Sequence, residues 1–226
     1  MSAVLPSNYP VTVQGHLDRE LGRWRWLVKW FLAIPHLVVL LFLWLAFAAL
    51  TVVAGVSIAF TGRYPRGIFD FNVGVMRWTW RVEFYAFTLA SDRYPPFSLR
   101  PDPGSPADLD VVYPEHLSRG LVWVKWWLLA IPHYLVVGVF TGGGAPYFAG
   151  GLIGVLCLIA GVTLAATRRY PNSIFDFVMG LHRWAWRVVV YAALMRDEYP
   201  PFRLDPGPDE PTEPSPEELS VDPLAA

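Results

Sequence analysis

The stretch RYPRGIFDFNVGVMRWTWRVEFYA, residues 63–86, is written a second time as RYPNSIFDFVMGLHRWAWRVVVYA, residues 169–192. The two stretches align without a gap and share 15 of 24 residues, far more than unrelated segments share by chance. Self-similarity of this kind marks an internal duplication. We therefore interpret the chain as two tandem copies of one structural unit.

The duplication extends outward from this stretch in both directions. An Ile-Pro-His motif precedes it in each copy, at 34–36 and 131–133, and a Tyr-Pro-Pro-Phe motif follows it in each copy. Because the order of motifs is the same, each repeat should adopt the same local structure. The predicted domains are repeat 1 (1–105), repeat 2 (106–204) and a tail (205–226).

The tail differs from the repeats in composition. After Arg203 the chain holds seven acidic residues, six prolines and no base. Such a segment has too little apolar surface to offset the entropy of ordering. We predict that it is disordered and solvated.

Composition and the spacing of charges point to a membrane protein. Hydrophobic residues make up 54% of the 226 residues, and the mean hydropathy is +0.35. No charged residue occurs between Lys29 and Arg63 or between Lys125 and Arg168, and such blocks are longer than the roughly 20 residues that span a bilayer. The single cysteine, Cys157, has no partner for a disulfide and is interpreted as a small core residue.

The uncharged blocks predict two spans per repeat. In repeat 2 the block is interrupted by TGGGAPYFAGG, a turn signal at 141–151, which places spans at about 122–140 and 147–166. Repeat 1 has no such loop, yet its block would be roughly 54 Å long as a helix, against a hydrocarbon core of about 30 Å. We expect a tight hairpin there, with spans at about 26–44 and 46–62. A single long helix, kinked or tilted, is the alternative.

The duplicated stretch itself predicts a third helix in each repeat, at about 66–90 and 172–195. As a span it would place two arginines near the bilayer centre, at about 2.5 to 3.5 kcal/mol each. A helix with an apolar body, a basic stripe and flanking Trp residues typically lies in the membrane interface. The predicted fold class is an all-α membrane protein in which each repeat is a transmembrane helical hairpin plus an interfacial amphipathic helix.

The positions of the bases predict the orientation. With two spans per repeat, all 18 Lys and Arg residues fall on one side of the membrane. By the positive-inside rule that side is the cytoplasm, and both termini are expected there. Short alternating runs on the same side could pair as a small β-sheet. These runs are VTV (11–13), FSL (97–99), LDVV (109–112) and FRL (202–204).

The repeated motifs resemble an uncharacterised family of bacterial integral membrane proteins, best known from actinobacteria and named only as a domain of unknown function. The resemblance rests on the IPH, RYP-IFDF, RWxWR and YPPF motifs and covers nearly the whole chain except the acidic tail. It implies a multi-pass protein of the bacterial inner membrane. It implies no activity.

Proline and histidine recur together inside the apolar blocks. Pro35 and Pro132 lie early in the first predicted span of each repeat, where proline removes a backbone hydrogen bond and kinks a helix. His36 and His133 follow directly, and polar groups at membrane depth are functional candidates. Three uses are open: a bis-histidine haem, a proton relay, or a hydrogen bond that locks the kink. No other cofactor is expected, and no ligand spacing predicts a metal site.

The RWTWR and RWAWR motifs form the second group of candidates. Arginines four residues apart share a helix face and repel each other unless an anion lies between them. One interpretation is a buried ion-pair network between the repeats, with Asp70 and Asp176 as acidic partners or as caps of the helix start. Another is a site for anionic lipid headgroups, or for a partner's acidic segment. The candidate residues are Arg77, Trp78, Trp80, Arg81, Arg183, Trp184, Trp186 and Arg187.

These features predict recognition rather than catalysis. The sequence shows no nucleophile with a base and no phosphate-binding loop, and its bases lie in apolar, Trp-rich segments rather than on a basic face that would bind nucleic acid. The predicted function is an inner-membrane accessory or scaffold protein that binds anionic lipid or a larger membrane complex. The alternatives are a transporter or channel, since duplicated repeats with broken helices are typical of transporters, and a bis-histidine haem electron carrier.

Overall fold

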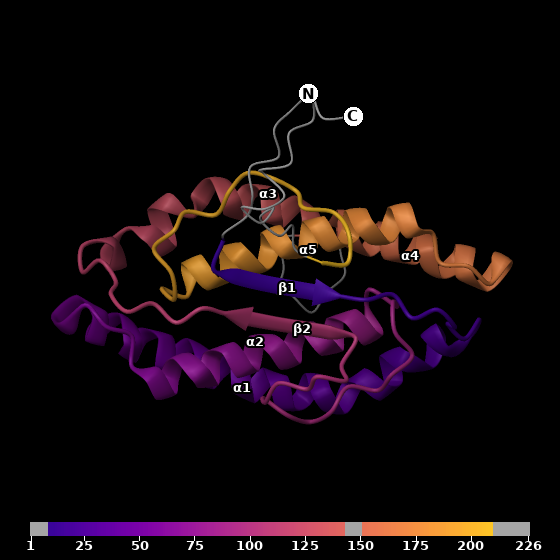
Figure 1. Cartoon of the computed structure of the whole chain (residues 1–226), viewed down its shortest axis with the longest axis horizontal. Coiled ribbons are helices and arrows are strands. Elements are labelled where there is room, and N and C mark those ends of the chain that lie inside the picture. The colour runs from indigo at the N-terminus through magenta and orange to yellow at the C-terminus, as the bar shows by residue number, and fades with distance from the viewer. Residues whose placement is uncertain (1–8, 143–150, 210–226) are drawn as a thin grey trace, which may run out of the picture.

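We describe residues 9–142 and 151–209 from a computed structural model of the chain. The architecture is mostly helical, with one sheet of two strands at its centre (Figure 1). The elements in chain order are β1 (Val11–Gly15), α1 (Arg25–Thr61), α2 (Arg66–Ala86), β2 (Ala107–Val111), the 3₁₀-helix η1 (Leu121–Trp123), the π-helix η2 (Lys125–Leu129), α3 (Ile131–Thr141), α4 (Gly151–Thr167) and α5 (Asn172–Ala192).

Repeat 1 contains one continuous long helix, α1, so the hairpin expected there is wrong. The helix runs through Pro35 and ends at Gly62, whose φ of 71° places it in the left-handed region. A tight turn needs a residue that leaves the helical region easily, and a left-handed glycine is the usual helix stop. Pro35 removes only one backbone hydrogen bond. α1 is therefore about 55 Å long.

Most of the surface of α1 is apolar and exposed. α1 is long and apolar enough to cross a membrane, and α3 and α4 are apolar but shorter. Only 17% of the most apolar window of α1 is buried, whereas the core helix of a soluble protein is mostly buried. Its buried residues form one stripe against α2, and side chains such as Phe31, Phe42 and Phe60 face outward.

The long helix of repeat 2 is divided into successive segments. α3 and α4 follow one another along α5 and do not form the hairpin that the sequence predicts (Figure 1). Phe140, at the end of α3, contacts Trp184, while Cys157 of α4 packs near Val178, earlier in α5. The predicted glycine-rich turn falls mostly on 143–150, outside the described residues. Repeat 2 is thus a broken version of the α1–α2 pair.

The π-helix η2 absorbs one extra residue in repeat 2. Repeat 1 reads KWFLAIPH at 29–36, whereas repeat 2 reads KWWLLAIPH at 125–133. A π-helical turn takes up one residue without ending the helix. The lysine and the Pro-His pair therefore keep equivalent positions in both repeats.

The two strands are exchanged between the repeats. β1 and β2 pair antiparallel, with Val13 opposite Leu109 at the centre of the register. Each strand precedes the helices of its own repeat, but β1 packs on α5 and β2 packs on α2 (Figure 1). Of the predicted runs, VTV lies within β1 and residues 109–111 of LDVV lie within β2, whereas FSL and FRL are not strands.

The helices α2 and α5 are core helices, and their prediction as interfacial helices is wrong. Sixteen residues of α2 are buried, including its whole second half. The apolar body packs against α1, and the basic stripe that was expected to face lipid headgroups faces the sheet instead. Acidic residues elsewhere in the chain neutralise that stripe, so neither face needs the membrane interface.

The continuous α1 also changes the argument about orientation. Arg25 and Arg63 stand at opposite ends of the helix. The placement of all bases on one side of a membrane depended on a hairpin, and it does not follow from this structure.

The folded part of the chain continues past the predicted start of the tail. Asp205 is only 7% exposed, and its Oδ2 lies 2.7 Å from Nη1 of Arg187. A carboxylate paired in this way belongs to the folded core. The remainder of the predicted tail, 210–226, lies outside the described residues.

A buried acid and a buried histidine face each other between α2 and α5. Glu83 Oε2 lies 4.0 Å from Nδ1 of His182, and Thr88 Oγ1 lies 3.4 Å from its Nε2. Burial raises the pKa of Glu83 well above its usual value, against a hydrogen bond from Trp186, and burial lowers the pKa of His182 to about 4. Burial therefore favours the neutral form of each group.

We expect Glu83→Gln to remove a loss of stability that grows as pH rises above about 4.3, the ordinary pKa of glutamate. The raised pKa of Glu83 means that the folded chain holds a proton that the unfolded chain releases, so stability falls as pH rises toward the folded pKa. The depressed pKa of His182 acts in the opposite direction, but only between about pH 4 and 6.5, where stability falls as pH falls. Thermal unfolding between pH 7 and 9 should isolate Glu83, and its slope with pH should flatten in the variant. Glu115→Gln, at an exposed glutamate, is the control; an equal flattening there would refute the assignment.

Candidate functional site

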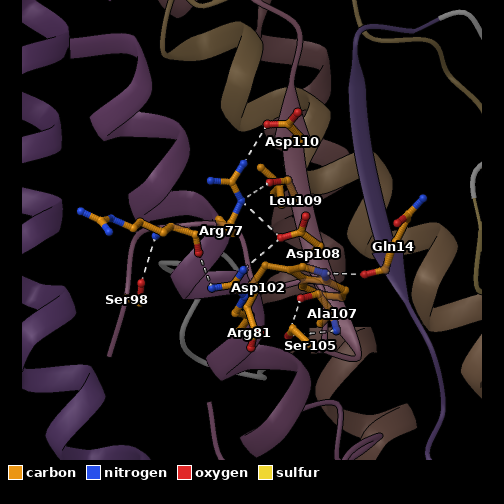
Figure 2. A network of polar contacts seen from close by, with 12 residues as sticks. Gln14, Arg77, Arg81, Ser98, Asp102, Ser105, Ala107, Asp108, Leu109 and Asp110 are labelled. Atoms are coloured by element: carbon orange, nitrogen blue, oxygen red, sulfur yellow. Dashed lines mark hydrogen bonds and ion pairs between the residues drawn. The ribbon is translucent and has the colours of Figure 1, made fainter. Parts of the chain in front are cut away.

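The arginines of repeat 1 face strand β2. Figure 2 shows Arg77 and Arg81, one helical turn apart on α2, reaching toward the strand. Asp108 Oδ1 lies between them, 3.2 Å from Nε of Arg77 and 3.1 Å from Nη2 of Arg81. Asp110 Oδ1 lies 2.8 Å from Nη2 of Arg77. The bridging carboxylate offsets the repulsion between the two guanidinium groups.

Backbone carbonyl groups complete the network in repeat 1. Arg77 Nε donates to the carbonyl of Leu109 at 2.9 Å, and Arg81 Nη1 donates to the carbonyl of Arg100 at 3.0 Å. Burial lowers the pKa of Arg81, and the carboxylate of Asp108 opposes that shift. Buried charge is tolerated here because acceptors replace the water that each guanidinium loses.

Repeat 2 uses the same design with a different acid. Arg183 Nε donates to the carbonyl of Val13 in β1 at 2.9 Å, the counterpart of the bond from α2 to β2. Strand β1 carries no acidic residue. Asp205, from the segment after the last helix, supplies the carboxylate to Arg187 and a backbone carbonyl to Arg183.

The structure buries the arginines and tryptophans of the two motifs. Their tryptophans point into the protein, and Trp80 Nε1 donates to the carbonyl of Gln14 at 2.8 Å. This placement favours the ion-pair network over a headgroup site at these arginines. The eight residues, each no more than 9% exposed, are Arg77, Trp78, Trp80, Arg81, Arg183, Trp184, Trp186 and Arg187.

The acidic partners of the network are not the predicted pair. Asp70 Oδ1 lies 3.3 Å from Nε of Arg66, four residues earlier, on the surface of α2. Asp176 offers its backbone carbonyl to the amide of Gly207 at 3.3 Å. Among the described residues, neither aspartate pairs with an arginine of the other repeat, which is the partnership that the sequence predicts.

The Ile-Pro-His motif of repeat 1 ends in an aromatic cage. Trp78 Nε1 donates to Nδ1 of His36 at 3.1 Å. Phe97 stacks on the imidazole at 3.9 Å between ring centroids, and Tyr94 lies at 4.8 Å. The hydroxyl of Tyr94 also donates to the carbonyl of Leu32, three residues before Pro35, at 3.3 Å. Three motifs that are far apart in sequence therefore meet at one fully buried histidine.

Repeat 2 reproduces this cage. Trp184 Nε1 donates to Nδ1 of His133 at 3.1 Å, with Phe202 stacked at 4.3 Å and Tyr199 at 4.7 Å. The hydroxyl of Tyr199 donates to the carbonyl of Leu129 at 3.3 Å. The two imidazoles share no neighbour among these contacts.

The cages favour a structural role for each histidine, which holds its helix against the core helix and the loop that follows it. Because the indole donates to Nδ1, the neutral ring of His36 carries its proton on Nε2. A haem iron usually binds deprotonated Nε2 while Nδ1–H donates to an acceptor, which is the reverse tautomer. The donor set therefore does not fit a bis-histidine haem, and no electron-transfer step follows from it.

A separate, exposed site lies where α4 ends. A cleft of about 610 Å³ is bordered by Arg19, Arg168 and Arg169, which are exposed and make no ion pair with any residue that the structure describes. Asp18 also lines the cleft, but its Oδ2 accepts hydrogen bonds from Ser91 Oγ and the amide of Asp92, both at 2.8 Å. The cleft is therefore a concentration of free positive charge.

Several of these residues are not predicted from the sequence. The acids Asp108, Asp110 and Asp205 gave no repeat signal, because the two repeats take their carboxylates from different segments. The cage could have been predicted, because the IPH, RWxW and YPPF motifs recur together in the sequence. Motifs that are kept in both copies are candidates for mutual contact. The cleft was hidden because its arginines belong to two distant segments.

Comparison with known proteins identifies a family. A family model described as Domain of unknown function (DUF4389) matches residues 23–98 and again 122–203, once in each repeat. Together these matches cover more than half of the chain and support the internal duplication. No curated protein and no solved structure matches the chain.

We expect Asp108→Ala to destabilise the fold by about 2 kcal/mol, because it leaves two buried guanidinium groups facing each other. The value is below the roughly 3 to 5 kcal/mol lost when a fully buried pair is broken, since the side chain of Asp108 is 37% exposed. Asp70→Ala also removes an ion pair, but one on the surface, and should cost less than about 0.5 kcal/mol. Equilibrium unfolding in detergent micelles measures both, and equal losses would contradict the network.

We expect Trp78→Phe and Trp184→Phe to destabilise the protein by similar amounts, about 1 to 3 kcal/mol each, because each leaves a buried imidazole nitrogen without its donor. Trp24→Phe, at a residue that is 59% exposed, is the matched control. The same unfolding measurement applies. A neutral result for both cage tryptophans would refute this structural role of the histidines.

Proposed function

The chain belongs to the DUF4389 family, whose description names no activity, and on that premise we propose that it is a non-enzymatic accessory protein of the bacterial inner membrane. Its proposed role is to hold anionic phospholipid headgroups at the cleft bordered by Arg168 and Arg169. The free arginines of this cleft are the single observation that carries the proposal.

The exposed apolar surface supports a location in the bilayer. Large side chains of α1 such as Phe42 and Phe60 are 65% and 77% exposed, and α4 presents Val155, Leu158 and Val162 at more than half exposure. Large apolar side chains exposed together on neighbouring turns of a helix are typical of a membrane interaction. At about 55 Å, α1 exceeds a hydrocarbon core of about 30 Å. It must therefore tilt strongly or run partly along the membrane.

The position of the cleft suits a lipid headgroup. It lies at the end of the apolar helix α4, where a hydrocarbon environment gives way to polar residues, and Leu164 and Leu21 line its inner wall. Guanidinium groups bind phosphate oxygens through paired hydrogen bonds. An anionic phospholipid satisfies both halves of this environment, because its chains stay in the bilayer and its phosphate meets the arginines.

The backbone at Arg168 supports a functional role for this arginine. Its φ is 62°, in the left-handed region, and the equivalent position in repeat 1 is Gly62 with φ of 71°. A side chain in this conformation costs roughly 1 to 2 kcal/mol that glycine avoids. Residues kept in strained backbone conformations tend to cluster at functional sites. An arginine where glycine would be more stable therefore fits selection for charge.

We expect Arg168→Gly to stabilise the fold by about 1 kcal/mol while lowering the retention of anionic lipid about fivefold, since each basic residue at an anionic surface contributes about 1 kcal/mol. The protein would be reconstituted in nanodiscs of phosphatidylcholine and phosphatidylglycerol, and native mass spectrometry would count retained phosphatidylglycerol.

Arg66→Ala is the control, because it removes an exposed charge outside the cleft. It should leave retention unchanged. The proposal fails if both variants retain the same amount of phosphatidylglycerol as the unmodified protein.

A further inference from the structure

An apolar groove separates the two repeats on one side of the protein. Its volume is about 560 Å³, and it lies between the second half of α1 and the segment η1–η2–α3 of repeat 2. α1 contributes Gly55 and Val56, and the other wall carries Trp123, Trp126 and Trp127. These aromatic side chains are about half exposed or more, so the groove is open toward the apolar surface.

The duplication explains why the groove is empty on this side. Lys29 and Lys125 occupy equivalent positions, so three residues earlier Trp26 is the counterpart of Val122. A Cβ atom added to Gly161 would lie 3.9 Å from the ring of Trp26, and one added to Gly55 would lie 3.8 Å from Val122. The same corner is therefore filled by an indole in one half of the molecule and by a small aliphatic side chain in the other.

A second contact closes the corner beside Trp26. The guanidinium of Arg23 donates to the carbonyl of Ala165 in α4. Its counterpart in repeat 2 is Arg119, four residues before Trp123 by sequence, where the side chain lies instead at the end of α1: Nε is 3.5 Å from the position of a Cβ at Gly62. The empty groove thus has an arginine at the polar end of its α1 wall.

The π-helical turn also belongs to the groove. Lys125–Leu129 carries Trp126 and Trp127 into the wall, and repeat 1 has no such turn. π-Helical turns arise from single-residue insertions and occur frequently at functional sites. The two departures from repeat symmetry, one insertion and one smaller side chain, therefore act on the same cavity.

Charge complementarity identifies the occupant. Arg119 and Arg63 are exposed at the end of α1 and make no ion pair with any residue that the structure describes. From Val56 to Arg63 the distance along the helix is about 10 Å, so one molecule can reach both groups. A phospholipid combines an apolar chain with a phosphate at its end, which matches an apolar groove that leads toward two arginines.

We propose that this groove binds one acyl chain of a membrane phospholipid whose phosphate lies against Arg119 and Arg63. The inference rests on the proposed location in a bilayer, but it uses residues outside the Arg168 cleft and describes a second lipid site. Repeat symmetry assigns the groove to ligand rather than to protein, because the chain fills the equivalent corner with its own tryptophan.

The test is photolabelling of the full chain in nanodiscs that contain a phosphatidylcholine with a diazirine on its acyl chain. Peptide mapping by mass spectrometry should find label on the α1 segment at 51–56 and on the segment at 122–127. Val122→Trp copies the residue of repeat 1 and fills the groove with an indole. Label at these segments should then fall about tenfold, because the indole occupies the volume of the acyl chain. Label on the outward face at 38–45 should be unchanged.

A second variant guards against a failure of Val122→Trp to fold. Val56→Trp blocks the groove from the α1 wall at a residue that is 55% exposed, and it should cause the same loss of label. Unchanged label at the groove in a folded variant would overturn the proposal, as would label confined to the outward face in the unmodified protein. Arg168→Gly should leave groove label intact, so a failure of the headgroup site and a failure of the groove are separate outcomes.

Discussion

The buried arginines at the centre of the molecule impose the constraint on which the rest of the structure depends. Arg77 and Arg183 lose nearly all contact with water, and each donates through Nε to the middle carbonyl of a strand. Those carbonyls belong to Leu109 and Val13, which are opposite each other in the register of the sheet. Because each strand precedes one repeat but receives the arginine of the other, neither repeat can satisfy its buried charge alone. The duplication is therefore folded as one unit.

The second feature that both repeats share is the aromatic cage around each buried histidine. It joins the long apolar helix to the core helix through Trp78 or Trp184 and to the loop after that helix through Phe97 or Phe202. The cage connects elements of one repeat, whereas the arginine network connects the two repeats. Together they hold a helix that otherwise touches the rest of the protein along only one stripe. This division explains why both motifs are written twice.

The differences between the repeats are concentrated at the rim of the molecule. An arginine replaces glycine at the end of α4, a valine replaces tryptophan beside Gly55, and one inserted residue forms the π-helical turn. Each change either frees positive charge or removes packing near the exposed apolar surface. Within the core, the same divergence places Glu83 of repeat 1 opposite His182 of repeat 2, whereas the equivalent residues are Val189 and Met76. The conserved parts of the repeat build the scaffold, and the divergent parts supply the candidate ligand sites.

The sequence by itself determined the duplication, the apolar character of the long helices and the requirement for anions beside the paired arginines, because identity, hydropathy and charge spacing are local properties. It also predicted the strands VTV and LDVV. Only the tertiary structure decided that α1 is unbroken, that the helices bearing the arginines are buried, and that Asp108 and Asp205 rather than Asp70 and Asp176 provide the charge. The physical reason is that a buried guanidinium can donate to any carboxylate or carbonyl oxygen at the correct distance. Which segment supplies it depends on the exchange of two short strands, and no periodicity in the sequence records that exchange.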